Sequence, residues 1–483
     1  MAVNKFIGGE RLKKLFSALA KVRMPHTYVL LFSFILIAAI LSWIVPAGQF
    51  ERVIVGEREV INPDSFKLVA SNPQGIFDIL TSLPRGFART QDISYFLFVT
   101  GGSFFIINQT GMIEAALSRI VSSLKGKEAI VIPVVVLMMG LAGSTIGLSE
   151  ETIVFIALGV SLARAIGYDS LIGVGMIGLG AGIGFTSGFM NPFSVGVAQS
   201  IADLPLFSGI ELRLVLFFIL WIVTSIYLVV YGRRVKADLS ASIVYEEELE
   251  ARNHADYQDL NSTESIEFSN KQKIISFVFV VGFFIIAFGV MNLGWFITEI
   301  GAVFLGMGLL SGLIYGMKAD AIADGFIEGA KDMMYAALIV GLAQSLIIIM
   351  EDAMILDTII HTLTGAISNL PSVLSAAGMY IVQIIINFFI SSGSGQAAVT
   401  MPIMVPLADA LDVSRQTAVL SYQLGNGFLD SIMPMSGILM AQLSIAKIPY
   451  RKWVKFAMPL MGIWLAIGLA FIIFAQVVGY GPF

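Results

Sequence analysis

The chain contains no cysteine and only three histidines, and these absences exclude several kinds of chemistry. Without cysteine, its 483 residues offer no disulfides and no thiolate nucleophile or ligand. His26, His254 and His361 lie far apart in the sequence and lack a metal-ligand spacing. The sequence also has no phosphate-binding loop and no Ser/His pair, so a nucleotide enzyme or a hydrolase of that type is not indicated.

Charge is scarce as well. Asp, Glu, Lys and Arg make up 13% of the chain, whereas 57% of its residues are hydrophobic. No soluble globular class has this composition, so we expect an all-α polytopic membrane protein in the lipid bilayer, without a nucleic-acid partner. Long unbroken apolar runs exclude a β-barrel, whose strands alternate. We expect no cleaved signal, because the first apolar run is of full length and no small-residue cleavage pattern follows it.

A polar stretch interrupts the apolar sequence at residues 143–152, which read Gly-Ser-Thr-Ile-Gly-Leu-Ser-Glu-Glu-Thr. The apolar runs before and after it, residues 130–141 and 153–163, are each too short to cross a bilayer, which takes about 20 apolar residues. The pattern therefore predicts a re-entrant hairpin over residues 129–166. Non-helical backbone at membrane depth is tolerated where it lines a protein cavity, and the adjacent carboxylates Glu150 and Glu151 mark a functional site there.

The remaining apolar runs give nine full spans and two re-entrant hairpins. The first repeat covers residues 27–231 and includes a broken helix at 171–202. Residues 232–273 form a linker, which we interpret as solvated rather than as a partner-binding tail. The second half, residues 274–483, holds an extra helix at 274–291 and a second repeat at 294–478, with a hairpin at 372–411 and a broken helix at 417–446.

The distribution of basic residues predicts the orientation. With the N-terminal residues 1–26 and the linker in the cytoplasm and the C-terminus outside, 22 of the 29 Lys and Arg residues fall on the inner side. This agrees with the positive-inside rule for the inner (plasma) membrane of a cell.

The two halves resemble each other in sequence. Leu-Gly-Ala-Gly at residues 179–182 matches Leu-Gly-Asn-Gly at 424–427, and Ala-Gln-Ser-Ile-Ala at 198–202 matches Ala-Gln-Leu-Ser-Ile-Ala at 441–446. At the same offset of roughly 245 residues, the first tip falls on the second, residues 394–397. Because the spans place the two hairpins on opposite sides, we predict the inverted repeat of secondary transporters, with a site near the midplane.

These motifs, together with Met-Pro-His-Thr at residues 24–27, Ile-Val-Pro-Ala-Gly at 44–48 and Met-Pro at 433–434, resemble those of the ion-transporter superfamily of elevator-type carriers. Within it, the chain is most similar to the four-carbon dicarboxylate anaerobic carrier-like family, which includes bacterial arginine–ornithine antiporters. The resemblance implies a scaffold domain and a moving transport domain, commonly in a homodimer. It implies no organic cofactor, but a coupling ion, sodium or a proton, near the hairpin tips.

The resemblance also implies that both tips and both helix breaks hold the substrate. The candidate residues are therefore the polar ones there: Ser144, Thr145, Ser149, Glu150, Glu151, Thr186, Ser187, Asn191, Ser392, Ser394, Gln396, Asn426, Asp430, Ser431 and Ser436. Dicarboxylate carriers of the superfamily typically have Ser-Asn-Thr at both tips. This chain departs from that pattern at both, so the resemblance does not by itself assign it the dicarboxylate specificity.

Side-chain charge distinguishes between substrates. The tips and breaks contain Glu150, Glu151 and Asp430 but no Lys or Arg. A dianion would be repelled by them, whereas a cationic or zwitterionic amino acid would pair with them. We therefore expect a small amino acid, arginine or ornithine for instance, moved by antiport or cation coupling, with a four-carbon dicarboxylate as the alternative.

Structural roles compete with each assignment. One of the two glutamates could cap the second hairpin helix, Asp430 could be a buried structural acid, and Asn191 could bridge backbone amides at the break. Ser394 and Ser436 could serve packing alone. Paired carboxylates could also serve as the general acid and base of an intramembrane enzyme, but the sequence has no Ser/His pair and no nucleotide motif to accompany them. A channel would show a symmetric selectivity ring rather than inverted hairpins. We therefore expect neither an enzyme nor a channel.

Overall fold

The computed structural model describes residues 27–481, apart from residues 56–57, 63–64, 114, 117–118, 120–127, 146, 192, 254–268, 294, 296 and 368–369. The predicted cytoplasmic N-terminus, most of the segment at 110–127 and part of the linker therefore lie outside the described residues. Within the described part, five helices are long and apolar enough to cross a membrane, and a bent pair adds a sixth if it forms one span. Several other predicted spans are shorter helices, such as Thr27–Leu41 (α2).

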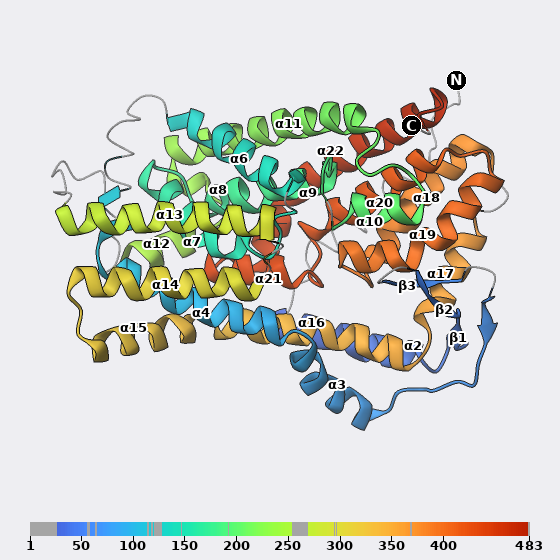
Figure 1. Ribbon diagram of the computed structural model, residues 1–483, viewed down its shortest axis with the longest axis horizontal. Helices are drawn as coiled ribbons and strands as arrows, with labels where there is room; N and C mark the ends of the chain where they lie inside the picture. Colours follow the sequence, from blue (N-terminus) through green and yellow to red (C-terminus); the bar gives the residue numbers. More distant parts are fainter. Residues whose placement is uncertain are drawn as a thin grey trace, which may run out of the picture.

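The helices form two groups that lie side by side along the long axis of the molecule (Figure 1). One group, which we call the α4/α16 group, contains α2, α3 (Ile76–Arg89), α4 (Gln91–Gln109), α13 (Asn270–Leu293), α14 (Ile297–Tyr315), α15 (Ala319–Asp332) and α16 (Met334–Asp352). Within it, α4 packs against α14 and α15, and α16 packs against α2 and α3.

The second group, the α9/α20 group, holds both predicted hairpins and both helix breaks. Its helices are α6 (Val131–Thr145), α7 (Thr152–Ala165), α8 (Ser170–Val174), α9 (Gly180–Ser187), α10 (Val195–Ile201), α11 (Ile210–Ala237), α18 (Ser372–Asn387), α19 (Gly393–Ala410), α20 (Arg415–Asp430), α21 (Gly437–Ile445) and α22 (Tyr450–Val477). A π-helical turn, Gly175–Leu179, joins α8 to α9. Between α16 and α18 lies the short helix α17 (Leu356–Gly365).

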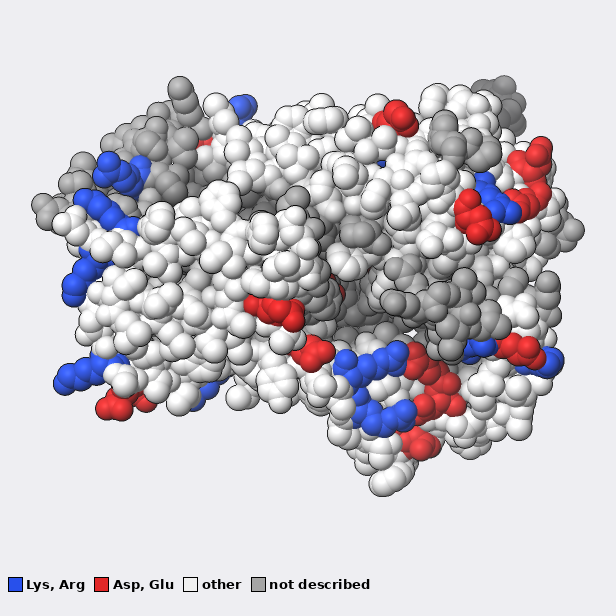
Figure 2. Space-filling model, viewed as in Figure 1, with Lys and Arg blue, Asp and Glu red and all other residues white. Residues whose placement is uncertain are grey.

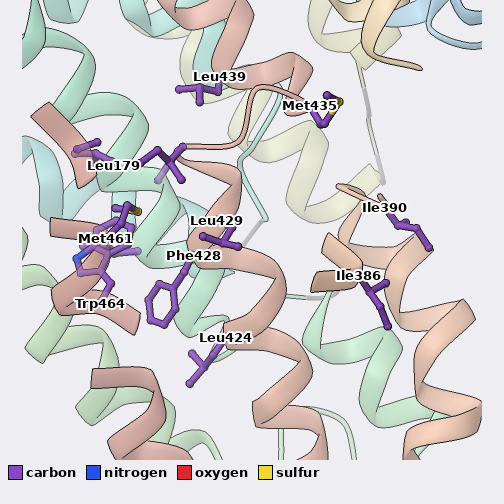
Figure 3. Close-up of a cluster of buried hydrophobic side chains, with 14 of the residues drawn as sticks. Leu179, Ile386, Ile390, Leu424, Phe428, Leu429, Met435, Leu439, Met461 and Trp464 are labelled. Carbon is purple, nitrogen blue, oxygen red and sulfur yellow. The ribbon is translucent and has the colours of Figure 1, made fainter. Parts of the chain in front are cut away.

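The centre of the α9/α20 group is closely packed because glycines bring helix backbones together. At Gly184 of α9, an added Cβ would lie 1.9 Å from the carbonyl oxygen of Gly140 on α6, so only glycine fits. On the other side of this group, Phe428 of α20 lies beside Trp464 of α22, with ring centroids 5.7 Å apart (Figure 3). Trp464 is fully buried, and its indole Nε1 donates to Thr224 Oγ1 over 3.0 Å. Such contacts hold α9 against α6, and α22 against α20 and α11.

The order of helices in the first half recurs in the second. Two series of seven helices have similar spacing along the chain and correspond one to one. They are α3, α4, α6, α7, α9, α10 and α11 in the first half and α15, α16, α18, α19, α20, α21 and α22 in the second. Helices of the two halves also pack on each other: α3 of the first half packs on α16 of the second, and α15 of the second half packs on α4 of the first. Each half is therefore completed by the other.

Besides a helix in the linker, which is described below, two helices and four short strands were not predicted. The helices are α3 and α15, which each precede a predicted span. The strands are β1 (Gly48–Gln49), β2 (Arg52–Val55), β3 (Arg58–Ile61) and β4 (Lys67–Leu68), paired antiparallel as β1 with β4 and β2 with β3. Residues 76–89 mix exposed apolar side chains with charged ones, so the sequence shows no long apolar run there.

The prediction of a solvated linker is wrong for its first part. Residues Leu239–Ala241 form a 3-10 turn and Tyr245–Asn253 form α12. Glu248 of α12 is 2% exposed and accepts hydrogen bonds from Arg164 Nε at 2.9 Å and from the Ser170 amide at 2.9 Å. This segment is therefore folded onto the α9/α20 group.

Charge is distributed unevenly along the long axis. Figure 2 shows mainly Lys and Arg at the end that carries the α14–α15 turn, a large uncharged area next to that end, and acidic and basic residues together from the middle towards the opposite end. An uncharged surface is what the apolar core of a bilayer requires of an embedded protein.

Candidate functional site

Both hairpin tips and both helix breaks border one cavity of about 430 Å³ between the two helix groups. This volume lies within the range of about 300–1,000 Å³ typical of ligand pockets. Seven of the predicted site residues line it: Ser149, Glu150, Glu151, Ser392, Ser394, Asp430 and Ser436. The cavity thus gathers predicted site residues that are up to 287 positions apart in the sequence.

At the first tip, the two glutamates have different surroundings. Glu151 immediately precedes α7, and its Oε2 accepts a hydrogen bond from the Ser149 amide over 3.1 Å. This bond ties the Glu151 side chain back to the tip, and Glu151 makes no side-chain cap hydrogen bond to α7. The Glu150 carboxylate accepts no hydrogen bond from any described residue and makes no ion pair with one, although it lines the cavity. Glu150 is therefore the tip carboxylate that is open to a ligand.

The first break is held by its own side chains. Asn191 Oδ1 accepts hydrogen bonds from the amides of Phe193 at 2.8 Å and Ser194 at 3.2 Å, which satisfies backbone groups that the broken helix leaves free. The hydroxyls of Thr186 and Ser187 donate back to carbonyls of α9. None of these three side chains lines the cavity.

The hydroxyls of Ser144 and Thr145 are likewise directed to their own helix, where both donate to the Leu141 carbonyl. In this conformation these residues support the first tip and do not face the cavity.

The second tip exposes hydroxyls at the start of a helix. Ser392 Oγ accepts a hydrogen bond from the Gly395 amide over 3.3 Å and so caps α19. Ser391, Ser392, Gly393 and Ser394 all line the cavity. The positive end of the α19 dipole therefore points at the cavity, which suits a carboxylate.

Gln396 and Asn426 turn away from the cavity into a buried polar network. Asn426 Nδ2 donates to Gln396 Oε1 over 3.0 Å, and Gln396 Nε2 donates to Gln383 Oε1 over 2.7 Å. Asn387 connects this network to the cavity, because its Nδ2 donates to Asp430 Oδ1 over 3.2 Å. Asp430 is thus positioned at the end of α20 by a buried amide, with its carboxylate at the cavity wall.

The sequence analysis missed one charged residue of the cavity. Arg89, at the end of α3, lines it, and its guanidinium forms a bidentate ion pair with Glu351 of α16 over 2.5 and 3.1 Å. The helical periodicity of residues 76–89 was the available signal, but it ends at a polar stretch and was not recognised. The tips and breaks themselves contain no basic residue, as predicted.

A second cavity of about 510 Å³ adjoins the first and shares Arg89, Gln344, Ile347, Ser391 and Ser392 with it. It extends past Glu351 to β1, β2 and α17, where Asp357 Oδ1 pairs with Arg52 Nη2 over 3.3 Å. A third cavity, of about 270 Å³, lies between α4, α7, α15 and α21. The central cavity is therefore reached from the side of the short strands.

The arrangement can bind a polar solute by charge. Glu150, Glu151 and Asp430 outnumber the single guanidinium, which is already paired, so the cavity favours cationic groups. Among the described residues there is no group of three His, Cys, Asp or Glu side chains that could hold a metal ion. The geometry thus suits binding of a solute through hydrogen bonds and ion pairs.

Comparison with protein families identifies the chain. The family model DcuC, described as C4-dicarboxylate anaerobic carrier, matches residues 24–477. The chain belongs to this family. It is a multi-pass membrane transporter and not an enzyme, which confirms the resemblance drawn from the motifs.

Two curated relatives match this carrier over nearly their whole length. A protein of Escherichia coli K12 named "Putative basic amino acid antiporter YfcC" is 33% identical over 497 aligned positions, covering 95% of this chain and 97% of the relative. A protein of Haemophilus influenzae Rd without an assigned function is 30% identical, covering 92% and 95%.

Two solved transporters have lower similarity. YdaH of Alcanivorax borkumensis is 14% identical with a TM-score of 0.41, and the alignment covers 95% of this carrier and 100% of YdaH. MtrF of Neisseria gonorrhoeae is 17% identical with a TM-score of 0.40, covering 95% of this carrier and 96% of MtrF. Scores at this level carry no further inference about the carrier.

Proposed function

We propose that this carrier exchanges small amino acids with a cationic side chain across the plasma membrane. The observation that supports this most is the charge of the central cavity, which Glu150, Glu151 and Asp430 make acidic. A basic amino acid offers two cationic groups for these carboxylates. The name of the relative in Escherichia coli agrees with this proposal.

Arg89 and the second tip complete the match. An amino acid also carries a carboxylate, and the Arg89 guanidinium and the N-terminal end of α19 are the groups in the cavity that attract an anion. Without substrate, Glu351 occupies the guanidinium. Since both side chains of this pair are more than 40% exposed, a substrate carboxylate can replace Glu351 at low cost.

The alternative is a four-carbon dicarboxylate, which the family description suggests. A dianion would have to displace Glu351 from Arg89 and still lie beside three carboxylates. It would need those carboxylates to be protonated or neutralised by coupling cations. The amino acid requires neither, so we favour it.

We further propose that the two halves form an inverted repeat and work as an elevator-type carrier. Helices α3, α16 and α19 line the second cavity, on the side of the short strands. Their counterparts in the other half, α15, α4 and α7 respectively, line the third cavity. Two corresponding cavities on either side of the central site are what alternating access needs. The α9/α20 group would carry the site, and the α4/α16 group would be the scaffold.

The distribution of charge supports the orientation. The basic end of the molecule carries the α14–α15 turn (Figure 2), which we place in the cytoplasm, so that the strands and the C-terminus face outwards. In this orientation the described conformation opens outwards. A homodimer remains a proposal from the family resemblance, as does a coupling ion.

Counterflow in proteoliposomes tests this function. Vesicles loaded with unlabelled arginine, ornithine or succinate are placed in labelled arginine, with and without a sodium gradient. We expect arginine and ornithine inside the vesicle to accelerate and saturate uptake, whereas succinate does not. Acceleration by succinate alone would favour the dicarboxylate, and linear uptake that does not saturate would contradict a carrier.

A further inference from the structure

The third cavity, of about 270 Å³, lies between the two helix groups and is separate from the central cavity. Helices α4 and α15 line it from the α4/α16 group, and α7 and α21 line it from the α9/α20 group. Among the described residues, no residue lines both this cavity and the central one. The third cavity is therefore a second space in which a solute can lie between the two groups.

Two opposite charges line this cavity, one from each group. Asp332 is the last residue of α15, and Lys447 lies two positions after the end of α21. Both residues are exposed, and the side chain of neither makes an ion pair or a hydrogen bond with any described residue. The carboxylate and the ammonium group are thus both free to pair with a charged ligand.

Three uncharged polar side chains also line the cavity. Asn108 of α4, Ser161 of α7 and Ser444 of α21 make no side-chain hydrogen bond with any described residue. Between them lie apolar side chains such as Phe104 and Leu158. A largely apolar wall with a few polar groups is the usual composition of a small-molecule site.

The backbone at Lys447 favours a different residue. Its φ is 55°, in the left-handed region, and the turn closes α21 through the Ile448 amide, which donates to the Leu443 carbonyl over 2.9 Å. Glycine is the usual residue at this place in a helix end, because it has no Cβ to strain. The turn therefore gives no reason for a lysine here, whereas a ligand in the cavity does.

The corresponding positions on the other side of the carrier form a closed ion pair. Helices α3 and α15 each have 14 residues and end at Arg89 and Asp332. Helices α4 and α16 each have 19 residues, and their last residues but one are Asn108 and Glu351. Arg89 and Glu351 pair with each other, whereas the side chains of Asp332 and Asn108 contact no described residue by a hydrogen bond or an ion pair. The charge on the side of the third cavity is thus left free.

We infer that the third cavity is a second binding site for an amino acid with a cationic side chain, distinct from the central site. Lys447 binds the carboxylate of this ligand, Asp332 binds its cationic side chain, and the aliphatic part lies on the apolar wall. The volume is close to the lower end of the range of about 300–1,000 Å³ typical of ligand pockets, so it suits one small solute. A dicarboxylate would place an anion beside Asp332, and an alkyl anion would leave Asp332 unpaired.

This inference rests on the proposed function for the class of the ligand, and it adds a specific consequence. Because Asp332 and Lys447 belong to different helix groups, an amino acid bound to both connects the groups and favours the conformation described here over one in which they have moved. The proposed orientation places the third cavity on the cytoplasmic side. A cytoplasmic amino acid would then hold the carrier with its central cavity open outwards.

Protection of a single cysteine tests the site in the full-length carrier. Ala157 is exposed on the wall of the third cavity, so the rate at which a maleimide labels the purified Ala157→Cys protein reports on occupancy. Arginine at about ten times its dissociation constant should slow this labelling about tenfold. The comparison ligands are agmatine, which lacks the carboxylate, citrulline, which has a neutral tip, and decanoate, an alkyl anion. We expect each of them to slow labelling much less than arginine does.

Two charge variants and their controls are made in this single-cysteine protein. Asp332→Asn and Lys447→Gln each remove one charge from the cavity with little change in side-chain size, and each should abolish the protection by arginine. The controls are Asp324→Asn on α15 and Lys455→Gln on α22, at exposed positions outside the cavity, and both should keep the protection. Since all four positions are exposed, the variants should retain the fold.

The variant Asp430→Asn separates the two sites. Asp430 lines the central cavity and not the third, so protection should persist in this variant. The inference is overturned if arginine gives no protection, if protection survives in either charge variant, or if it is lost in Asp430→Asn. Protection by decanoate alone would overturn it as well and would assign the cavity to an amphiphilic anion.

Counterflow of arginine on the same single-cysteine protein distinguishes this result from a failure of the proposed function. Exchange of arginine without protection would reject the second site alone. Protection without exchange would reject the proposed function and leave the second site in place.

Discussion

Removing the charge of Asp430 is the most informative single change. Asp430→Asn preserves the size of the side chain, and the amide oxygen that it introduces can still accept the hydrogen bond from Asn387 Nδ2, now 3.2 Å long. The fold should therefore be retained. What is lost is the negative charge at the wall of the central cavity.

The size of the effect follows from the interaction that is removed. A hydrogen bond to a charged group contributes about 1.5–3 kcal/mol. Since about 1.4 kcal/mol corresponds to a factor of ten in affinity, arginine should bind about 10- to 150-fold more weakly. We expect exchange to be abolished at substrate concentrations that saturate the wild type.

Calorimetric titration of the purified protein measures the affinity, and counterflow measures exchange. Asp412→Asn is the matched control, because Asp412 is exposed on the turn before α20 and lies outside the cavity. Citrulline, which lacks the cationic tip, should lose less affinity than arginine. Arginine affinity within twofold of the wild type in Asp430→Asn would refute the role of this carboxylate.

Three other substitutions give separate predictions. Arg89→Ala should weaken arginine binding about tenfold but leave the affinity for agmatine, the decarboxylated analogue, unchanged. The control Arg85→Ala breaks a similar ion pair outside the central cavity and should change neither affinity. Equal losses of affinity for both ligands in Arg89→Ala would argue against a contact with the substrate carboxylate. Glu248→Ala leaves Arg164 unpaired in a largely buried place and should destabilise the protein by about 3 kcal/mol, measured by thermal unfolding. Glu250→Ala, at an exposed position of the same helix, is the control. An unchanged melting temperature of Glu248→Ala would contradict the packing of α12. Gly184→Ala places a Cβ 1.9 Å from a backbone oxygen, so this variant should not elute as a monodisperse peak in size-exclusion chromatography. The control Gly462→Ala, where an added Cβ meets nothing within 4 Å, should elute as the wild type does. A normal elution profile of Gly184→Ala would mean that α6 and α9 are further apart than described.

The polar tips and breaks could be predicted because their signal is local. A polar stretch between two short apolar runs predicts an interruption of the helix whatever surrounds it, and the structure has helix ends at Thr145 and Thr152 and at Asn387 and Gly393. The family could be predicted from motifs of the same kind, and the family comparison confirmed it.

What the sequence missed depends on distant contacts. Arg89 reaches the cavity only because α3 packs on α16, a helix 245 positions later in the chain. Glu248 is buried only because α12 folds back onto Arg164 and the Ser170 amide. Likewise, nothing local distinguishes Gln396, which faces the Gln383–Asn426 network, from Ser394 two residues earlier, which faces the cavity.

The opposite orientation of the two halves is the claim on which the proposed mechanism depends, and single-cysteine labelling tests it directly. The chain has no cysteine, so each introduced thiol is unique. Ala157→Cys lies on the third cavity, at the sixth residue of α7, and Val399→Cys lies on the second cavity, at the seventh residue of α19. In right-side-out vesicles, a membrane-impermeant maleimide should label the Val399→Cys protein, and it should label the Ala157→Cys protein only after the membrane is opened. Labelling of both variants from the same side would contradict the inverted arrangement.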